Sequence, residues 1–164
     1  MKGLLICVAL LVTALLNAQS DPAKRIVRDS FSLKYPTDWT IDTVDEDYDP
    51  DTFFSIDSPG DNTIMFFLLP ADTDQTELLN AQLESFSSHV IKKPEITEFA
   101  KWGAFQGTGR LLKGKILGIF KGFVRVFIYG DSSRTLLVVE QCYDKDYQKL
   151  QKGFELISSS FRFK

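Results

Sequence analysis

The sequence predicts an α+β domain in which a twisted, antiparallel-rich β-sheet carries helices on both faces, as an α/β/α sandwich. Three observations indicate this fold: short apolar segments follow one another across brief turns, two of these segments are apolar on both sides, and two longer segments have helical periodicity. Brief links favour antiparallel pairing of consecutive strands. A strand that is apolar on both sides needs cover on both faces of its sheet, which the two helices supply.

The first twenty residues have the order of a secretory signal peptide. A basic start at Met1–Gly3 precedes the apolar run Leu4–Leu16, and Ala18 provides a small residue for cleavage. The run is shorter than the roughly 20 residues that span a bilayer, which disfavours a transmembrane anchor and a buried N-terminal helix. Cys7 lacks the preceding small residue of a lipoprotein cleavage site. We expect residues 1–18 to be removed and the protein to be exported, either periplasmic or secreted.

The mature chain is predicted to be one domain over residues 31–164, preceded by a polar leader at 19–30. Alternating or continuous apolar residues predict its first strands. These are a strand pair within 31–43, a strand at 53–56 and a strand at 64–69. Residues 95–142 are rich in β-branched and aromatic side chains and contain seven glycines. That composition predicts three or four antiparallel strands with glycines at turns, bulges or sites of close packing.

Two segments have the spacing of amphipathic helices. The first, at 74–91, begins with Asp74 as N-cap and is expected to end before Pro94. The second, at 145–158, contains Gly153, which costs about 1 kcal/mol relative to Ala within a helix. The apolar stripes are Leu79, Leu83, Phe86 and Val90 on the first helix and Tyr147, Leu150, Phe154, Ile157 and Phe161 on the second.

Residues 31–39, Phe-Ser-Leu-Lys-Tyr-Pro-Thr-Asp-Trp, resemble the F-x-x-x-Y-P-x-x-W opening of PsbP-like domains. Ser160-Phe161 resembles the common ending of these domains, and the order of elements between is similar, so the resemblance covers nearly all of residues 28–164. It implies the PsbP-like α/β/α sandwich, which DcrB-like exported proteins and a Ran-binding import factor share. Most such proteins are binders, scaffolds or assembly factors, so the resemblance implies an accessory role.

The residue inventory excludes several kinds of site. His89 is the only histidine, which rules out a multi-histidine metal site; it is expected to complement the dipole at a helix end. Cys142 is the only cysteine left after maturation and follows an apolar run, so it is expected to be a buried hydrophobe. Residues 109–115 have the G-x-x-x-x-G-K spacing of a phosphate loop, but Ile116 stands where Ser or Thr should bind magnesium. No cofactor is expected.

The charges of the chain are segregated, although its net charge is only -3. Residues 38–61 hold nine acids and no Lys or Arg, whereas residues 92–125 hold eight bases and two acids. The acidic segment offers alternate carboxylates as a weak Ca²⁺ candidate, against the simpler interpretation of a solvated loop. The carboxylates are Asp45, Asp47, Asp49 and Asp51.

The basic segment is the expected contact surface for a protein partner in the cell envelope, against the equal alternative of solvated strand edges. An acidic overall balance makes nucleic acid an improbable partner. The expected function is a non-enzymatic, exported accessory or binding domain. The alternatives are a small hydrolase that uses carboxylates alone and a carrier of a lipophilic ligand, the latter because of the 14 phenylalanines. The candidate partner-binding residues are Arg110, Lys113, Lys115, Lys121 and Arg125.

Overall fold

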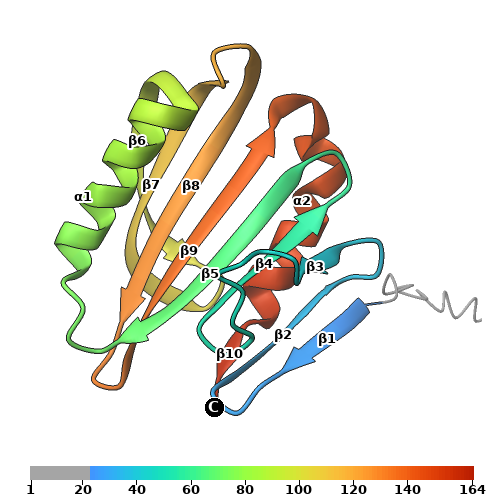
Figure 1. Ribbon diagram of the computed structural model, residues 1–164, viewed down its shortest axis with the longest axis vertical. Helices are drawn as coiled ribbons and strands as arrows, with labels where there is room; N and C mark the ends of the chain where they lie inside the picture. The colour runs from blue at the N-terminus through green and yellow to red at the C-terminus, as the bar shows by residue number, and fades with distance from the viewer. Residues whose placement is uncertain (1–22) are drawn as a thin grey trace, which may run out of the picture.

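The computed structural model describes residues 23–164, so the predicted signal peptide lies outside the described residues. The larger of its two antiparallel sheets has the strand order β3-β4-β5-β9-β8-β7-β6, and the smaller has the order β1-β2-β10 (Figure 1). The larger sheet consists of β3 (Thr40–Asp42), β4 (Phe53–Ser58), β5 (Asn62–Pro70), β6 (Ile91–Trp102), β7 (Phe105–Ile116), β8 (Phe120–Gly130) and β9 (Arg134–Tyr143). The smaller consists of β1 (Ala23–Val27), β2 (Phe31–Pro36) and β10 (Arg162–Phe163).

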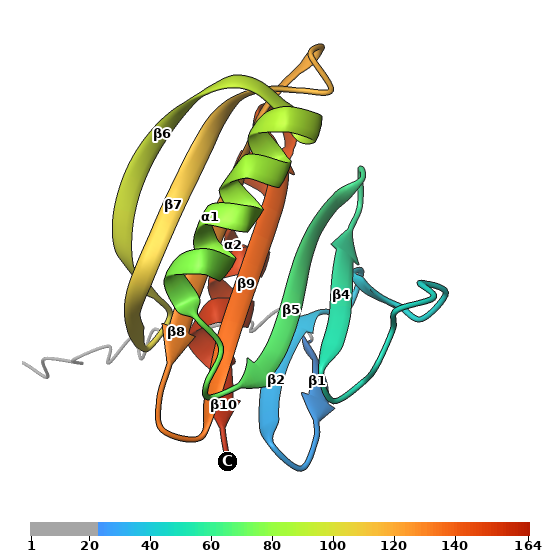
Figure 2. The same cartoon turned by 60° about the vertical axis from the view of Figure 1, so that its left-hand side comes forward.

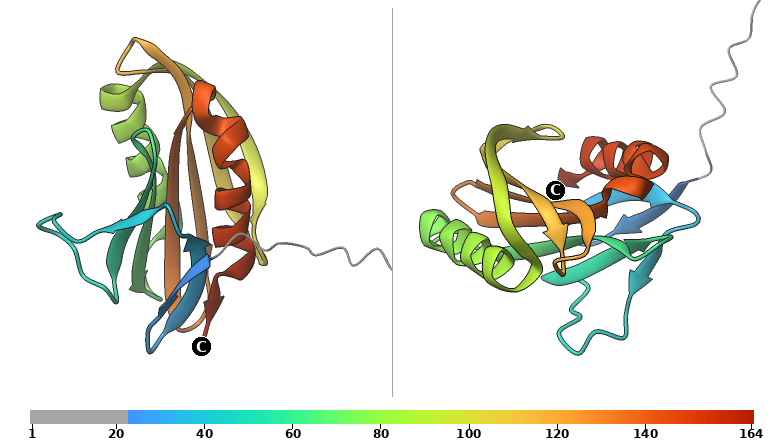
Figure 3. Two further views of the ribbon diagram at one scale, coloured as in Figure 1. Left: turned by 90° about the vertical axis from the view of Figure 1, so that its right-hand side faces the viewer. Right: turned by 90° about the horizontal axis from the view of Figure 1, so that it is seen from above.

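The two helices, α1 (Gln75–Ser85) and α2 (Asp144–Ser160), cover opposite faces of the larger sheet, as the sequence predicts (Figure 3). On β9, Leu136 and Val138 belong to the core that includes α2, whereas Leu137 and Val139 belong to the core that includes α1. Each of the four is at most 1% exposed. Burial on both faces explains why this segment is apolar at every position.

The small sheet joins α2 in covering one face of the larger sheet, and four phenylalanine rings connect them. Phe31 of β2 stacks on Phe54 of β4, whose ring stacks on Phe66 of β5, with centroid distances of 5.2 and 4.7 Å. Phe161, directly after α2, stacks on both Phe31 and Phe66, at 5.6 and 5.7 Å. All four side chains are at most 2% exposed, so aromatic packing holds the two sheets and α2 together.

The helix α1 begins as predicted but ends earlier. The Asp74 carboxylate accepts hydrogen bonds from the backbone N–H groups of Thr76 and Glu77, which confirms the N-cap. The α-helix stops at Ser85 and continues as one π-helical turn, η1 (Phe86–Val90). The prediction that Pro94 ends the helix is wrong, because Ile91 is fully buried opposite Ile116 and already has strand geometry. Of the predicted stripe only Leu79 is buried; Leu83, Phe86 and Val90 pack at the margin of the core.

Two further elements differ from the sequence prediction. The strands within 31–43 form, but β2 pairs with β1 and β10 whereas β3 pairs with β4. A turn closed by the Trp39 N–H to the Pro36 carbonyl separates them, and burial of Trp39 redirects the chain between the two sheets. The segment 19–30, expected to be a leader, contains β1. Ile26 is the one buried side chain of β1, which leaves no alternation to detect.

Candidate functional site

The outer strands of the larger sheet bend toward α2 and form a groove with it. In Figure 3, viewed from above, the β6–β7 hairpin curls to the side on which α2 lies. Its turn residue Gly103 packs on the end of α2, where a Cβ would clash with the Ser158 carbonyl oxygen. Two adjoining hollows of about 390 and 370 Å³, both lined by Leu111 and Arg125, follow β7. We name them together the β7 groove; the other lining residues are Thr97, Glu98, Phe99, Lys101, Lys113, Phe123, Asp144, Tyr147 and Gln148.

Arg125 is the cation at the centre of the β7 groove. Its Nη1 donates a hydrogen bond of 2.7 Å to Oε2 of Glu140. The guanidinium also lies near the rings of Phe99 and Phe123, with Cζ 5.8 and 5.5 Å from their centroids. The Arg125 side chain remains 28% exposed, so the groove presents a positive charge whose position is already fixed.

Glu140 fixes this arginine from inside the protein. It lies on β9, is 2% exposed, and accepts a second hydrogen bond, of 2.8 Å, from Nε1 of Trp102 at the end of β6. Burial raises the pKa of Glu140, while the charge of Arg125 and the bond from Trp102 act in the opposite direction. Sequence reasoning missed Glu140 and Trp102. The detectable signal was an acid directly after the buried run Leu136–Val139.

The structure separates the five predicted basic residues into two groups. Arg110 lies in register with Val126 of the α1-side core and forms an ion pair of 2.9 Å with the exposed Glu98. The other four lie on the α2 side. Lys113 is in register with Phe123 of that core, and Lys121 and Arg125 are each two residues from Phe123 along β8. Lys115 is in register with Lys121. Within this second group Lys113 and Arg125 line the β7 groove. Lys115 and Lys121 lie opposite each other, nearer to the β7–β8 turn.

The acidic segment forms the loop between β3 and β4, and its carboxylates bind the backbone of the loop itself. Asp45 and Asp49 each accept a hydrogen bond from the N–H two residues later. The bond from the Asp51 N–H is the first cause of the lowered pKa of Asp49, followed by bonds from Thr52. Among residues 23–164, no group of three or more His, Cys, Asp or Glu side chains is placed to hold a metal ion. The structure therefore does not gather Asp45, Asp47, Asp49 and Asp51 into a calcium site.

The remaining candidate groups have structural roles. Residues 109–115 lie within β7, in strand geometry, which supports rejection of a phosphate loop. Cys142 is fully buried, and burial raises the pKa of its thiol to about 12. His89 lies in the last turn of η1, where Nδ1 donates to the Ser85 carbonyl at 3.1 Å. The one buried carboxylate of the described chain, Glu140, is paired with an arginine and not with a second acid.

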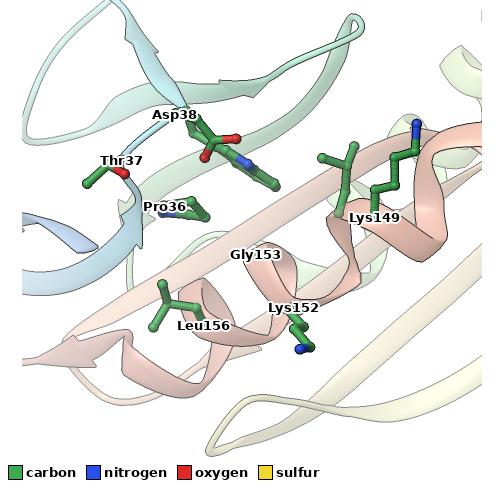
Figure 4. Close-up of a pocket in the computed structure, with 9 residues that line it drawn as sticks. Pro36, Thr37, Asp38, Lys149, Lys152, Gly153 and Leu156 are labelled. Carbon is green, nitrogen blue, oxygen red and sulfur yellow. The ribbon is translucent and has the colours of Figure 1, made fainter. Parts of the chain in front are cut away.

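A second pocket, of about 390 Å³, lies between the turn after β2 and α2 (Figure 4). Its lining includes Pro36, Asp38, Lys149 and Lys152, and Gly153 forms part of its floor. In Figure 4 the side chains of Lys149 and Lys152 extend in different directions from α2. Because these charged groups do not converge, the pocket lacks the arrangement of a catalytic or anion-binding site.

Comparison with solved structures identifies the fold. The chain is similar to cyanobacterial PsbP (CyanoP) from Synechocystis, with a TM-score of 0.54 over 88% of this chain and 94% of that chain, at 11% sequence identity. The fold is PsbP-like. The PsbP-like arrangement expected from residues 31–39 and 160–161 is thereby confirmed. No family model and no curated protein matches the sequence.

Two other solved structures are similar to this chain at lower TM-scores. They are LpqN, involved in cell envelope biogenesis of Mycobacterium tuberculosis, and the Ran-binding protein Mog1p of Saccharomyces cerevisiae. Their TM-scores are 0.47 and 0.46, their identities 14% and 13%, and they cover 87% and 84% of this chain and 86% of their own chains. Within the described part of this PsbP-like chain, no helix is long and apolar enough to cross a membrane.

Proposed function

We propose that this PsbP-like domain is a non-enzymatic binding module that is exported to the cell envelope and recognises an acidic segment of a protein partner in the β7 groove. The observation that supports this proposal is the environment of Arg125. The buried Glu140 holds its guanidinium between two aromatic rings, while part of the side chain remains exposed to solvent. A side chain that is already ordered loses little conformational entropy on binding, and arginine beside aromatic rings is typical of binding hot spots.

The cations of the β7 groove support an acidic partner, because they outnumber the two acids of its lining, Asp144 and Glu98, and Glu98 is already paired with Arg110. Lys101 and Lys113 line the two hollows of the groove on either side of Arg125. Both are exposed, and neither is within ion-pair distance of a carboxylate among the described residues. Cations along a groove attract an acidic segment and set its orientation, with an effect that salt screens.

Affinity capture from the native envelope, followed by mass spectrometry, tests the proposal. The Lys101→Ser/Lys113→Ser variant is expected to retain less partner and to show a flatter dependence on ionic strength. Lys149→Ser/Lys152→Ser is the matched control, because it removes the same charge from exposed positions on α2 outside the groove. Equal capture by the two variants, or loss of capture only when Asp45, Asp47 and Asp49 are replaced, would contradict the assignment.

The export part of the proposal has its own test. The intact mass of the protein recovered from the envelope or the medium is expected to correspond to a chain that begins at Gln19. A mass that still includes residues 1–18 would show that this part of the proposal is wrong.

A further inference from the structure

The turn between β7 and β8 exposes three large apolar side chains. Leu117, Ile119 and Phe120 are 64%, 70% and 49% exposed. The turn is the outermost point of one end of the molecule, beyond the ends of both helices (Figure 1, Figure 2). Single exposed apolar residues are ordinary, but an adjacent group of them on a protruding turn is typical of a contact surface.

The backbone holds these side chains outward. The Gly118 N–H donates to the Lys115 carbonyl and the Ile119 N–H donates to the Ile116 carbonyl, each at 3.1 Å. The Leu117 N–H donates to the Val90 carbonyl at 2.7 Å. Leu117 has a φ of 51°, in the left-handed region that bulky residues rarely occupy. The turn therefore has a leucine at a position where glycine or asparagine would be less strained and would expose less apolar surface.

A row of lysines lies directly beneath the turn. Lys92 of β6 is in register with Lys115 of β7, which is in register with Lys121 of β8. All three side chains are exposed. Like charges opposite each other in a sheet are mutually destabilising. Within residues 23–164 the ion pairs formed by basic strand residues involve Arg110 and Arg125, so no carboxylate neutralises this row. An external anionic surface relieves the repulsion.

We propose that the β7–β8 turn docks on an anionic phospholipid surface, a role that goes beyond recognition of a protein partner in the β7 groove. Leu117, Ile119 and Phe120 enter the boundary between headgroups and acyl chains. Lys92, Lys115 and Lys121 bind anionic headgroups, with their aliphatic stems against the apolar layer and their ammonium groups in the headgroup region.

The shape and charge of the region favour a lipid surface over a protein pocket. The apolar group is convex, and its cations are distributed across three adjacent strands rather than gathered at one point. Such an arrangement fits a laterally extended anionic plane. Insertion of a turn requires no membrane-spanning helix.

Vesicle binding by the full mature domain tests the proposal, with vesicles of phosphatidylglycerol and phosphatidylcholine in equal parts and vesicles of phosphatidylcholine alone. Ile119→Trp places a fluorescent reporter in the turn, while the native Trp39 and Trp102 are 2% and 3% exposed. We expect blue-shifted, brighter emission with the anionic vesicles, and quenching when their lipids carry bromine on the acyl chains. Emission that stays at its aqueous position, or an equal response to the neutral vesicles, would overturn the proposal.

Variants separate the apolar turn from the lysine row. Replacing Lys92, Lys115 and Lys121 by Ser should weaken sedimentation with anionic vesicles by about fivefold per lysine, the change that corresponds to about 1 kcal/mol for each basic side chain near such a surface. The charge-matched control is Lys34, Lys149 and Lys152 replaced by Ser, three exposed lysines elsewhere. Equal loss in both triple variants would show attraction by net charge alone and overturn the assignment to the turn.

The apolar variant combines Leu117→Asn, Ile119→Ser and Phe120→Ser, where asparagine suits the left-handed position. It should lose vesicle binding while it keeps its thermal transition, and Val44→Ser, at a residue 91% exposed in the acidic loop, should change neither. Retained vesicle binding by the apolar variant would contradict insertion. The same variant is expected to retain capture of a protein partner through the β7 groove, so loss of capture alone would indicate that the turn contacts a protein instead.

Discussion

The indole of Trp39 lies against Gly153 so closely that a Cβ at residue 153 would be 2.6 Å from Cζ2 of the ring. Trp39 is 2% exposed and packs edge-on against Phe154, with centroids 5.1 Å apart. The contact joins the turn after β2 to the middle of α2. Gly153 is therefore not the weak point of the helix that its propensity indicates, because the absence of a side chain permits this packing.

Gly153→Ala is expected to destabilise the domain by about 1 to 2 kcal/mol, since forcing a methyl group into a packed site costs more than the propensity gain of about 1 kcal/mol returns. Urea unfolding followed by circular dichroism measures the change. Lys152→Ala, one residue earlier and exposed, is the matched control and should be nearly neutral. A stabilised Gly153→Ala variant would contradict the contact.

The two ion pairs of the larger sheet are expected to differ in their contribution to stability. Arg125→Met leaves the buried Glu140 carboxylate without its cation and should cost about 3 to 5 kcal/mol. Arg110→Met, which breaks the exposed pair with Glu98, should cost less than about 1 kcal/mol. Adding Glu140→Leu to Arg125→Met should restore much of the loss, because it removes the unpaired charge. Equal effects of the two arginine substitutions in urea unfolding would contradict this account.

Glu140 should also make stability depend on pH. Burial raises its pKa above the ordinary 4.5, so the folded protein keeps a proton that the unfolded chain has released. The free energy of unfolding is then expected to fall as pH rises from about 4.5 through the raised pKa. Asp49 and Asp131 have pKa values lowered from 3.8, so they change the free energy of unfolding only at pH values below this window.

Glu140→Gln should remove that decline, measured as urea midpoints from about pH 4 to about pH 8. Glu98→Gln, at the exposed partner of Arg110, is the control and should leave the decline in place. An unchanged slope in Glu140→Gln would show that another group titrates.

Cys142 is expected to resist thiol reagents in the native protein. It is fully buried on β9, and burial raises its pKa to about 12, so almost no thiolate exists at neutral pH. Labelling by a chromogenic disulfide at pH 8 should be slow in buffer and rapid in denaturant. Rapid native labelling would indicate that β9 opens locally.

The sequence predicts well whatever depends on apolar periodicity. Leu136–Val139 is apolar at each position because both helices cover β9, and this pattern alone indicates a sheet covered on both sides. The N-cap at Asp74 is equally local, since a carboxylate there bonds N–H groups within three residues. Both features require only neighbours in the chain.

The unpredicted features depend on distant partners. The side chains of Trp102, Arg125 and Glu140 meet from three different strands. Trp102 is 38 positions from Glu140 in the sequence and Arg125 is 15 positions from it, so no local pattern links them. The early end of α1 follows from the burial of Ile91 against Ile116, not from Pro94. The faces of the five basic residues, by contrast, follow simple alternation. Strands β7 and β8 pair in an unbroken register from Thr108–Ile128 to Ile116–Phe120, and the register irregularities lie in β6, which holds none of the five.

The pairing of β2 with β10 has a consequence for how the domain is made. The Lys34 N–H binds the Ser160 hydroxyl 126 residues away, and the Phe161 ring packs on Phe31 at the other end of the chain. A ribosome must therefore synthesise residue 163 before the first-made strands gain their last neighbour. Such long-range closure slows folding. We expect the nascent domain to stay protease-sensitive until synthesis reaches β10.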